Sequence, residues 1–472
     1  MDKSEEEAVM ATVSPKDSLC EDSDKRADDK LNVQIKEYDT QEQEETGNKE
    51  EKPECLVLRK TILRSSYPQP GSTGYSPRLT FGVEIEMAVA SLRDICVDPE
   101  PGDERVAYGI SRPAGSPPLE YDPRPAEFGS DAPLDREYRY EGLKCLFEHM
   151  AAVFRNAGLQ VLHEATVKPL HERDENGDWI TDCWIIGTDK TIECPDETVY
   201  DFHQIEIKSP VFYYSEAAVE EVRKVCALVS STYRLFCNES MGLHVHVGNG
   251  VMGFDGRTLR NLFGILWTTE KWLETIHPTH RTRGNVHCQG FRTCSLLPFM
   301  FSRSENIESK TLEWIMGDSM PTKVKNILDL IKSHSGGYNF INLVSELNAN
   351  SFKRTIEFRQ HESTLNGERV VQWIHLCIGL VNLSAATETN ELALRLRKLI
   401  NTRQKSITVA DVLKYLGLER SAEYYRQQVP GASRRKKMKC LWSVLKQWTC
   451  RRTTRGQRRN RVWIKRHRDI EK

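Results

Sequence analysis

Residues 81 to 87 read Phe-Gly-Val-Glu-Ile-Glu-Met, and this alternation is the strongest indication of how the chain folds. In a β-strand, successive side chains point to opposite faces. Val83 and Ile85 therefore fall on one face, whereas Glu84 and Glu86 share the other face, roughly 7 Å apart. The pattern predicts a strand that covers a core with one face and presents two carboxylates on the other.

Three further segments repeat this parity. Residues 205–210 read Ile-Glu-Ile-Lys-Ser-Pro, residues 242–248 read Gly-Leu-His-Val-His-Val-Gly, and residues 355–361 read Thr-Ile-Glu-Phe-Arg-Gln-His. Their polar faces carry Glu206, His244, His246, Glu357, Arg359 and His361. If the four strands share one sheet, one of its faces is a cluster of carboxylates, imidazoles and a guanidinium.

Each motif also has an ordinary structural interpretation. A Glu-x-Glu strand is commonly a solvated face, His244 and His246 could bond backbone carbonyls, and Glu357 with Arg359 could form an ion pair across a sheet. Four such segments in one chain favour a site. Carboxylate-rich sites suit Mg²⁺ or Mn²⁺, and two such ions can clamp the phosphates of a nucleotide. Arginine adds a planar, bidentate grip on phosphoryl oxygens.

Helical periodicity accompanies these strands in residues 143–154, 219–233, 262–273 and 370–381. Because strands and helices mix without regular βαβ repeats, the expected fold class is α+β, with a mainly antiparallel sheet packed by helices. The chain has no phosphate-binding glycine loop and no kinase signature. We therefore expect any nucleotide to be held largely through metals.

The two ends of the chain differ from its middle. Residues 1–64 form a polar tail predicted to be disordered, with 18 Asp and Glu against 8 Lys and Arg in the first 54 residues. A Pro- and Gly-rich linker, 65–78, leads into a catalytic domain expected at 79–400, in which 97–139 is a Pro/Gly-rich insert that borders the site. A helical extension, 401–430, precedes a basic tail, 431–472, which has 16 Lys and Arg against 2 Asp and Glu.

Composition also bears on location and partners. No apolar run approaches the roughly 18 residues of a membrane helix, and the N-terminus lacks a signal-peptide pattern. An intracellular protein is expected, cytoplasmic in the first place and nuclear as an alternative suggested by the basic tail. Because Trp442, Trp448 and Trp463 interrupt that tail, it could bind nucleic acid or an anionic surface, or simply be solvated or self-associating. The 13 scattered cysteines include no Cys-x-x-Cys pair, which favours free thiols.

The four strand motifs, in this order, resemble those of the amidoligase family, within the glutamine synthetase and glutamate-cysteine ligase superfamily of carboxylate-amine ligases. The resemblance spans about residues 80 to 385. It implies a strongly curved antiparallel sheet with the site in its concavity. It also implies an enzyme that uses ATP to phosphorylate a substrate carboxylate and then joins an amine to the acyl phosphate.

The resemblance further implies roles for individual residues. The metal ligands would be Glu84, Glu86, Glu206, His244 and Glu357, binding Mg²⁺ or Mn²⁺. Arg359 would be both a catalytic and an ATP-contacting residue, with His246 and Asp189 also near the ATP. Glu357 and, as a second-rank candidate, Arg354 would complete the catalytic set.

The chain departs from the family pattern at three places. Lys190 and Thr191 follow Asp189 where Gly-Ser is common, Lys208 stands where an apolar or small residue is usual, and Ser363 replaces a common glycine. Lys208 shares the face of Glu206, so it could weaken a cation site or form a salt bridge. No proposed metal ligand is missing, which favours an active enzyme.

Two alternatives remain open from the residues alone. One is a hydrolase using Zn²⁺ on His244, His246 and a carboxylate. The other is a catalytically inactive scaffold or nucleic-acid-binding protein that acts through the basic tail. The identities of the acid and the amine, whether small molecules or peptides, and the oligomeric state are not predicted by the sequence.

Overall fold

The computed structural model describes most of the chain between residues 78 and 428. The described ranges are 78–93, 96–107, 133–164, 182–195, 199–250, 252–282, 284–331, 336–343, 353–402 and 407–428, with the backbone alone described for 133–142. The predictions made for the acidic tail 1–64, for linker residues 65–77, for residues 108–132 of the insert and for the basic tail 431–472 lie outside these ranges.

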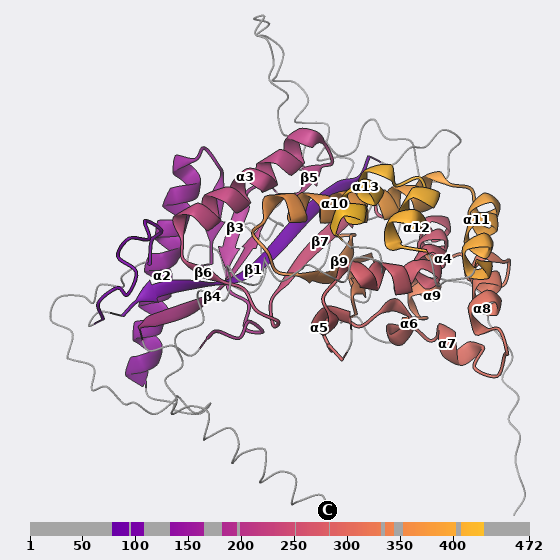
Figure 1. The fold of residues 1–472 in the computed structure, drawn as a ribbon, viewed down its shortest axis with the longest axis horizontal. Helices are drawn as coiled ribbons and strands as arrows, with labels where there is room; N and C mark the ends of the chain where they lie inside the picture. The colour runs from indigo at the N-terminus through magenta and orange to yellow at the C-terminus, as the bar shows by residue number, and fades with distance from the viewer. Residues whose placement is uncertain are drawn as a thin grey trace, which may run out of the picture. The chain divides into compact units, whose positions relative to one another are not determined.

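A nine-stranded sheet forms the centre of the fold (Figure 1), with the strand order β2-β3-β4-β1-β7-β9-β8 and with β5 and β6 paired to β1. The strands are β1 (Thr80–Leu92), β2 (Val161–His163), β3 (Trp184–Gly187), β4 (Tyr200–Lys208), β5 (Phe212–Tyr213), β6 (Leu235–Phe236), β7 (Gly242–Gly248), β8 (Tyr338–Asn339) and β9 (Ile356–Glu362). Among these nine strands of the described residues, β2 and β3 alone pair in parallel. The predicted α+β class with a mostly antiparallel sheet packed by helices is confirmed.

The four motif strands lie side by side, in the order β4-β1-β7-β9. Strand register places their apolar residues on one face, because Ile85 pairs with Ile207 on β4 and with Leu243 on β7. These side chains are buried in the main hydrophobic core. The opposite face carries Glu84 level with His244, and Glu86 level with Glu206. The parity predicted from the sequence therefore holds for β1, β4 and β7.

Strand β9 departs from simple alternation. Leu243 pairs with His361 and Val245 with Phe358, so that one residue of β7 faces two residues of β9 at a bulge. His361 is thereby turned onto the apolar face, where its ring lies 5.5 Å from that of Trp373. The sequence prediction that His361 shares a face with Glu357 and Arg359 is wrong, because the extra residue at the bulge reverses the parity beyond it.

Helices cover the apolar face of the sheet. The longer ones are α2 (Pro133–Asn156), α3 (Glu216–Thr232), α4 (Gly256–Leu273), α8 (Ile307–Met316), α10 (Gly367–Ala386), α11 (Thr389–Asn401) and α13 (Glu419–Gln428). Shorter ones are η2 (Glu274–Ile276), α5 (Thr279–Thr282), α6 (Phe291–Cys294), α7 (Leu297–Met300), α9 (Val324–Leu328), η3 (Ile341–Leu343) and α12 (Val409–Tyr415). In Figure 1, α3 and α10 lie next to each other across the sheet, and α10 also contacts β7. The four helices predicted from periodicity correspond to α2, α3, α4 and α10.

Polar caps define where three of these helices begin. The side chains of Ser215, Asp255 and Asn366 accept hydrogen bonds from the backbone N–H groups three residues onward, at the starts of α3, α4 and α10. Each cap satisfies a backbone donor that the helix itself leaves without a partner. The caps thus define where the helices that pack on the apolar face of the sheet begin.

Helix α10 is, among the described residues, the helix that is long and apolar enough to cross a membrane by length and composition alone. In this structure 67% of the most apolar 18-residue stretch of this helix is buried. It packs against α3, α4, α13 and β7. This central place in the core accounts for its apolar composition.

The C-terminal helices α12 and α13 belong to the same core as the sheet. Val412, Leu413 and Tyr425 are buried in the main hydrophobic core, and α13 packs against α10.

The cysteines in the described part of the chain are all free.

Candidate functional site

Side chains from four adjacent strands converge on the polar face of the sheet. We refer to them as the strand-face cluster, which consists of Glu84, Glu86, Glu206, His244, His246 and Glu357. Glu86, His244 and Glu357 are almost fully buried, with side-chain exposures of 4%, 4% and 5%. Desolvated carboxylates are unfavourable unless they are paired or bind a cation. Bringing these carboxylates together therefore costs stability unless each is paired or a cation binds.

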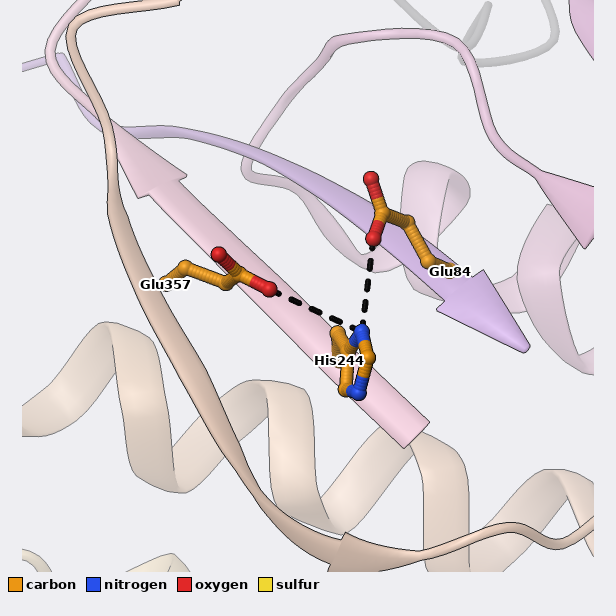
Figure 2. A group of neighbouring side chains, drawn as sticks. All are labelled: Glu84, His244 and Glu357. Carbon is orange, nitrogen blue, oxygen red and sulfur yellow. Dashed lines mark hydrogen bonds and ion pairs between the residues drawn. The ribbon is translucent and has the colours of Figure 1, made fainter. Parts of the chain in front are cut away.

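His244 lies at the centre of the cluster. Figure 2 shows Glu84 and Glu357 directed toward its ring from either side. The Nδ1 atom of His244 is 3.3 Å from Glu84 Oε2 and 3.6 Å from Glu357 Oε1. One donor atom from each of the three side chains lies within 4.8 Å of the others, close enough for the three to hold one metal ion together. We call these residues the first donor group.

The other nitrogen of His244 faces a second acidic pair. Its Nε2 atom is 3.5 Å from Glu86 Oε1, and Glu86, Glu206 and His244 also offer donor atoms within 4.8 Å of one another. We call these residues the second donor group. Glu86 and Glu206 are opposite each other in register on β1 and β4. Like charges in that relationship destabilise a sheet.

Burial and mutual repulsion alter the acidity of this pair. Burial, reinforced by the neighbouring carboxylates Glu84 and Glu86, raises the pKa of Glu206 to about 8. Burial also raises the pKa of Glu86. For Glu84, burial acts in the same direction, but the neighbouring His246 and Lys353, together with hydrogen bonds to His244 and His246, outweigh it and hold its pKa well below the ordinary value. Burial and repulsion thus favour protonation of the second donor group's carboxylates unless a nearby positive charge offsets them.

His246 flanks the first donor group. Its Nε2 atom is 3.2 Å from Glu84 Oε1, and its Nδ1 atom is 3.0 Å from the Thr355 hydroxyl. His246 Nε2 is also 3.9 Å from Glu357 Oε1. His246, which is predicted to lie near a nucleotide, therefore lies beside the two carboxylates of the first donor group.

Two arginines were predicted to act at this site, and Arg359 contacts the cluster. The Arg359 guanidinium forms an ion pair with Glu357, and its Nε donates to the carbonyl of His287 over 3.4 Å. Arg354 lies before β9 with a φ of 46°, is exposed, and packs against Gly253 in the loop after β7. Its catalytic role stays a prediction.

Asp189 lies just after β3, next to the second donor group. Its carboxylate accepts hydrogen bonds from the backbone N–H and the hydroxyl of Thr191, each at 2.7 Å. Its negative charge acts on Glu86. Asp189 is thus near the site, but one of its carboxylate oxygens stabilises a turn. Thr191, one of the departures from the family pattern, supplies that turn.

The other two departures also contact the cluster. Lys208 Nζ is 3.1 Å from Glu206 Oε2, which matches the salt bridge considered from the sequence. The Ser363 hydroxyl donates to the backbone carbonyl of Glu86. Both departures from the family pattern therefore bond to residues of the strand-face cluster.

Several residues at the site were assigned no role from the sequence. Lys353 Nζ lies 3.7 Å from Glu84 Oε1, and Asn339 Nδ2 donates to Glu357 Oε2 over 2.8 Å. Arg281, which is 3% exposed, donates from Nη2 to the carbonyl of Arg359 over 2.5 Å, at the β9 bulge. The backbone N–H of Gly242 donates to Glu86 Oε2 over 2.6 Å. These contacts orient the carboxylates and the bulge.

Comparison with known proteins assigns the family. A family model described as "Putative amidoligase enzyme" matches residues 77–381, more than half of the 472-residue chain. The chain belongs to this amidoligase family, and all residues of the strand-face cluster fall within the matched region. Membership identifies it as an enzyme of the ligase type. No curated protein matches the chain.

Proposed function

We propose that the protein is an ATP-dependent carboxylate-amine ligase that forms an amide or peptide bond through an acyl phosphate. The observation that carries the proposal is the first donor group beside Arg359. Glu84, His244 and Glu357 come from three adjacent strands, and Arg359 contacts Glu357 at the edge of this group. A cation donor set next to a guanidinium suits a phosphoryl group more than it suits other ligands.

The donor chemistry fits Mg²⁺ or Mn²⁺. Hard divalent cations prefer carboxylate oxygens, and four buried or nearly buried glutamates converge here with two histidines. Glu84, His244 and Glu357 would hold such an ion, and on the family resemblance Glu86 and Glu206 are further candidates. When bound, a divalent ion neutralises negative charge on the phosphates.

The proposed chemistry takes place on the substrates in two steps. A carboxylate oxygen attacks the γ-phosphorus of ATP, the bond to the β-phosphate oxygen breaks, and ADP leaves. The amine nitrogen then attacks the acyl carbon, inorganic phosphate leaves, and the nitrogen loses a proton. The products are one amide, one ADP and one phosphate for each ATP consumed.

The chain's own residues would position and stabilise the reacting groups. Arg359 would contact the equatorial phosphoryl oxygens as negative charge develops there. Asn339 holds Glu357 through its second carboxylate oxygen, and Thr355 holds the His246 ring. Such hydrogen bonds to ligand side chains fix their orientation. Burial of the cluster limits water, which would otherwise hydrolyse an acyl phosphate.

The geometry gives less support to the zinc hydrolase. Each donor group in the described residues contains a single histidine, and His246 belongs to neither. The inactive scaffold or nucleic-acid binder would depend on the basic tail, which lies outside the described residues. The predicted binding of nucleic acid through that tail remains a separate prediction.

A screen for ADP release tests the proposal. The purified protein is incubated with ATP and Mg²⁺ against libraries of carboxylic acids and amines. We expect ADP only when a suitable acid is present, and amide formation when both substrates are present. The Glu84→Gln variant should release none. ADP release that does not depend on any acid, or that persists in Glu84→Gln, would contradict the proposed site.

A further inference from the structure

We propose that Lys208 serves as a built-in counter-cation for the second donor group, so that without nucleotide the site binds one divalent ion, at Glu84, His244 and Glu357. This inference rests on the proposed function because it concerns the same cluster. It predicts how many cations the protein itself holds, which the family assignment leaves open.

The register of the sheet puts Lys208 on the same face as the cluster and next to it. Lys208 is level with Glu84 across β4 and β1, just as His244 is level with Glu84 across β1 and β7. Residues that pair across an antiparallel sheet share a face. The lysine side chain therefore lies on the acidic face, where its ammonium is 3.1 Å from Glu206 Oε2 and its side chain is 24% exposed.

The position of Lys208 opposes a second divalent ion. Its ammonium already contacts one of the two carboxylates that would bind that ion. A divalent cation on Glu86 and Glu206 would have to displace this contact and would be repelled by the positive charge next to it. Glu84 is also level with Lys208, but its carboxylate lies 3.2 Å from His246 Nε2 and 3.7 Å from Lys353 Nζ.

The chemistry of the His244 ring also limits the site to one divalent ion. A neutral imidazole has one nitrogen with a free lone pair and one N–H. If Nδ1 binds a cation held by Glu84 and Glu357, then Nε2 carries the proton and can donate toward Glu86 Oε1, 3.5 Å away. The second donor group is then reduced to two carboxylates, one of which contacts Lys208. Two ions on one imidazole would require both of its nitrogens to be deprotonated.

The experiment is equilibrium dialysis of the full-length protein against Mn²⁺ at pH 8 without nucleotide, with the bound metal counted by mass spectrometry. Wild type should bind one Mn²⁺ per chain tightly. Lys208→Met, which keeps the length of the side chain but removes its charge, should bind a second Mn²⁺ at least about 10-fold more tightly than wild type does, the scale of effects from groups next to metal ligands. Lys208→Arg, which keeps the charge, should still bind one.

The matched control is Lys353→Met, because Lys353 is also a partly exposed lysine in contact with a cluster carboxylate, Glu84. It should not add a second ion. In addition, Glu206→Gln should retain the single ion with affinity within about threefold, whereas Glu84→Gln should weaken it by about 10-fold or more. This pair of variants tests the inference even if Lys208→Met does not fold.

The outcomes separate this inference from the proposed function. Two tightly bound ions in wild type, one ion in folded Lys208→Met, or loss of the ion in Glu206→Gln would each overturn the role of Lys208 while leaving a cation site in place. No bound ion in wild type or in any variant would overturn the cation site itself and, with it, the inference.

Discussion

Gly242 leaves the space that the ring of His244 occupies, because a Cβ on Gly242 would lie 2.8 Å from His244 Nε2. The same Cβ would lie 2.8 Å from Nη2 of Arg281. Real Cβ atoms do not approach other atoms so closely, and both neighbours are buried side chains with little room to move. The absence of a side chain at Gly242 therefore decides where the central histidine of the site can point.

The substitution Gly242→Ala should consequently damage the site more than the fold. We expect Mn²⁺ affinity to fall by about 10-fold or more, as when a residue that orients a metal ligand is lost. Calorimetric titration measures the affinity. The matched control is Gly82→Ala on β1, where a Cβ would make only ordinary contacts, the nearest at 3.6 Å from the Ser209 hydroxyl. Equal affinities in the two variants would show that His244 is not confined in this way.

Arg359→Lys should impair phosphoryl transfer without removing the cation. Lysine keeps the positive charge but loses the planar pair of donors. Turnover should fall by about 10²-fold or more, the effect of losing one donor that stabilises developing charge, while Mn²⁺ affinity changes little. Arg354→Lys is the control, because Arg354 is exposed and packs against Gly253. If Arg354→Lys has the larger effect on ADP release, the assignment of the phosphate-contacting arginine must be reversed.

Truncation should locate the C-terminal boundary of the catalytic domain. Removing residues after Pro430 should leave the folding transition and ligase activity largely intact, because α13 ends at Gln428. Removing residues after Thr402 should abolish cooperative unfolding, since it deletes Leu413 and Tyr425 from the core. Thermal melts monitored by circular dichroism distinguish the two. Loss of activity in the protein truncated after Pro430 would place part of the basic tail in the catalytic domain.

His375 should make the stability of the protein depend on pH. It is 5% exposed, its Nδ1 lies 2.6 Å from the Tyr214 hydroxyl, and burial lowers its pKa to about 4. Between its folded pKa and the ordinary value of about 6.5, the unfolded chain binds more protons than the folded one. Its contribution to stability is therefore complete above pH 6.5 and is lost as the pH falls toward 4.

The variant His375→Gln should flatten this dependence. The change in unfolding free energy between pH 7 and pH 4 should shrink by an amount on the order of 3 kcal/mol at most, from about 1.4 kcal/mol for each unit of pKa shift. Urea unfolding at several pH values provides the measurement. Parallel curves for wild type and variant would mean that His375 titrates equally in both states.

Strand alternation was enough to predict which residues of β1, β4 and β7 share the polar face of the sheet, whereas the set of metal ligands was implied by the family resemblance. Glu84, Glu86, Glu206 and His244 lie on regular strands, where the two-residue period decides the face. His361 was misplaced because a bulge leaves no mark in the pattern of β9. Lys353 and Asn339 were assigned no role because Lys353 lies before β9 and Asn339 lies on the two-residue strand β8, which is too short to show periodicity. Their contacts depend on tertiary packing.

Trapping with hydroxylamine tests the central claim most directly. An acyl phosphate is electrophilic, so hydroxylamine added with ATP, Mg²⁺ and a suitable carboxylic acid should convert it into a hydroxamate even without the natural amine. We predict one hydroxamate for each ADP released, and neither product in the Glu84→Gln variant. ADP release without hydroxamate, or no hydroxamate from any acid in a broad library, would contradict the ligase mechanism proposed for this site.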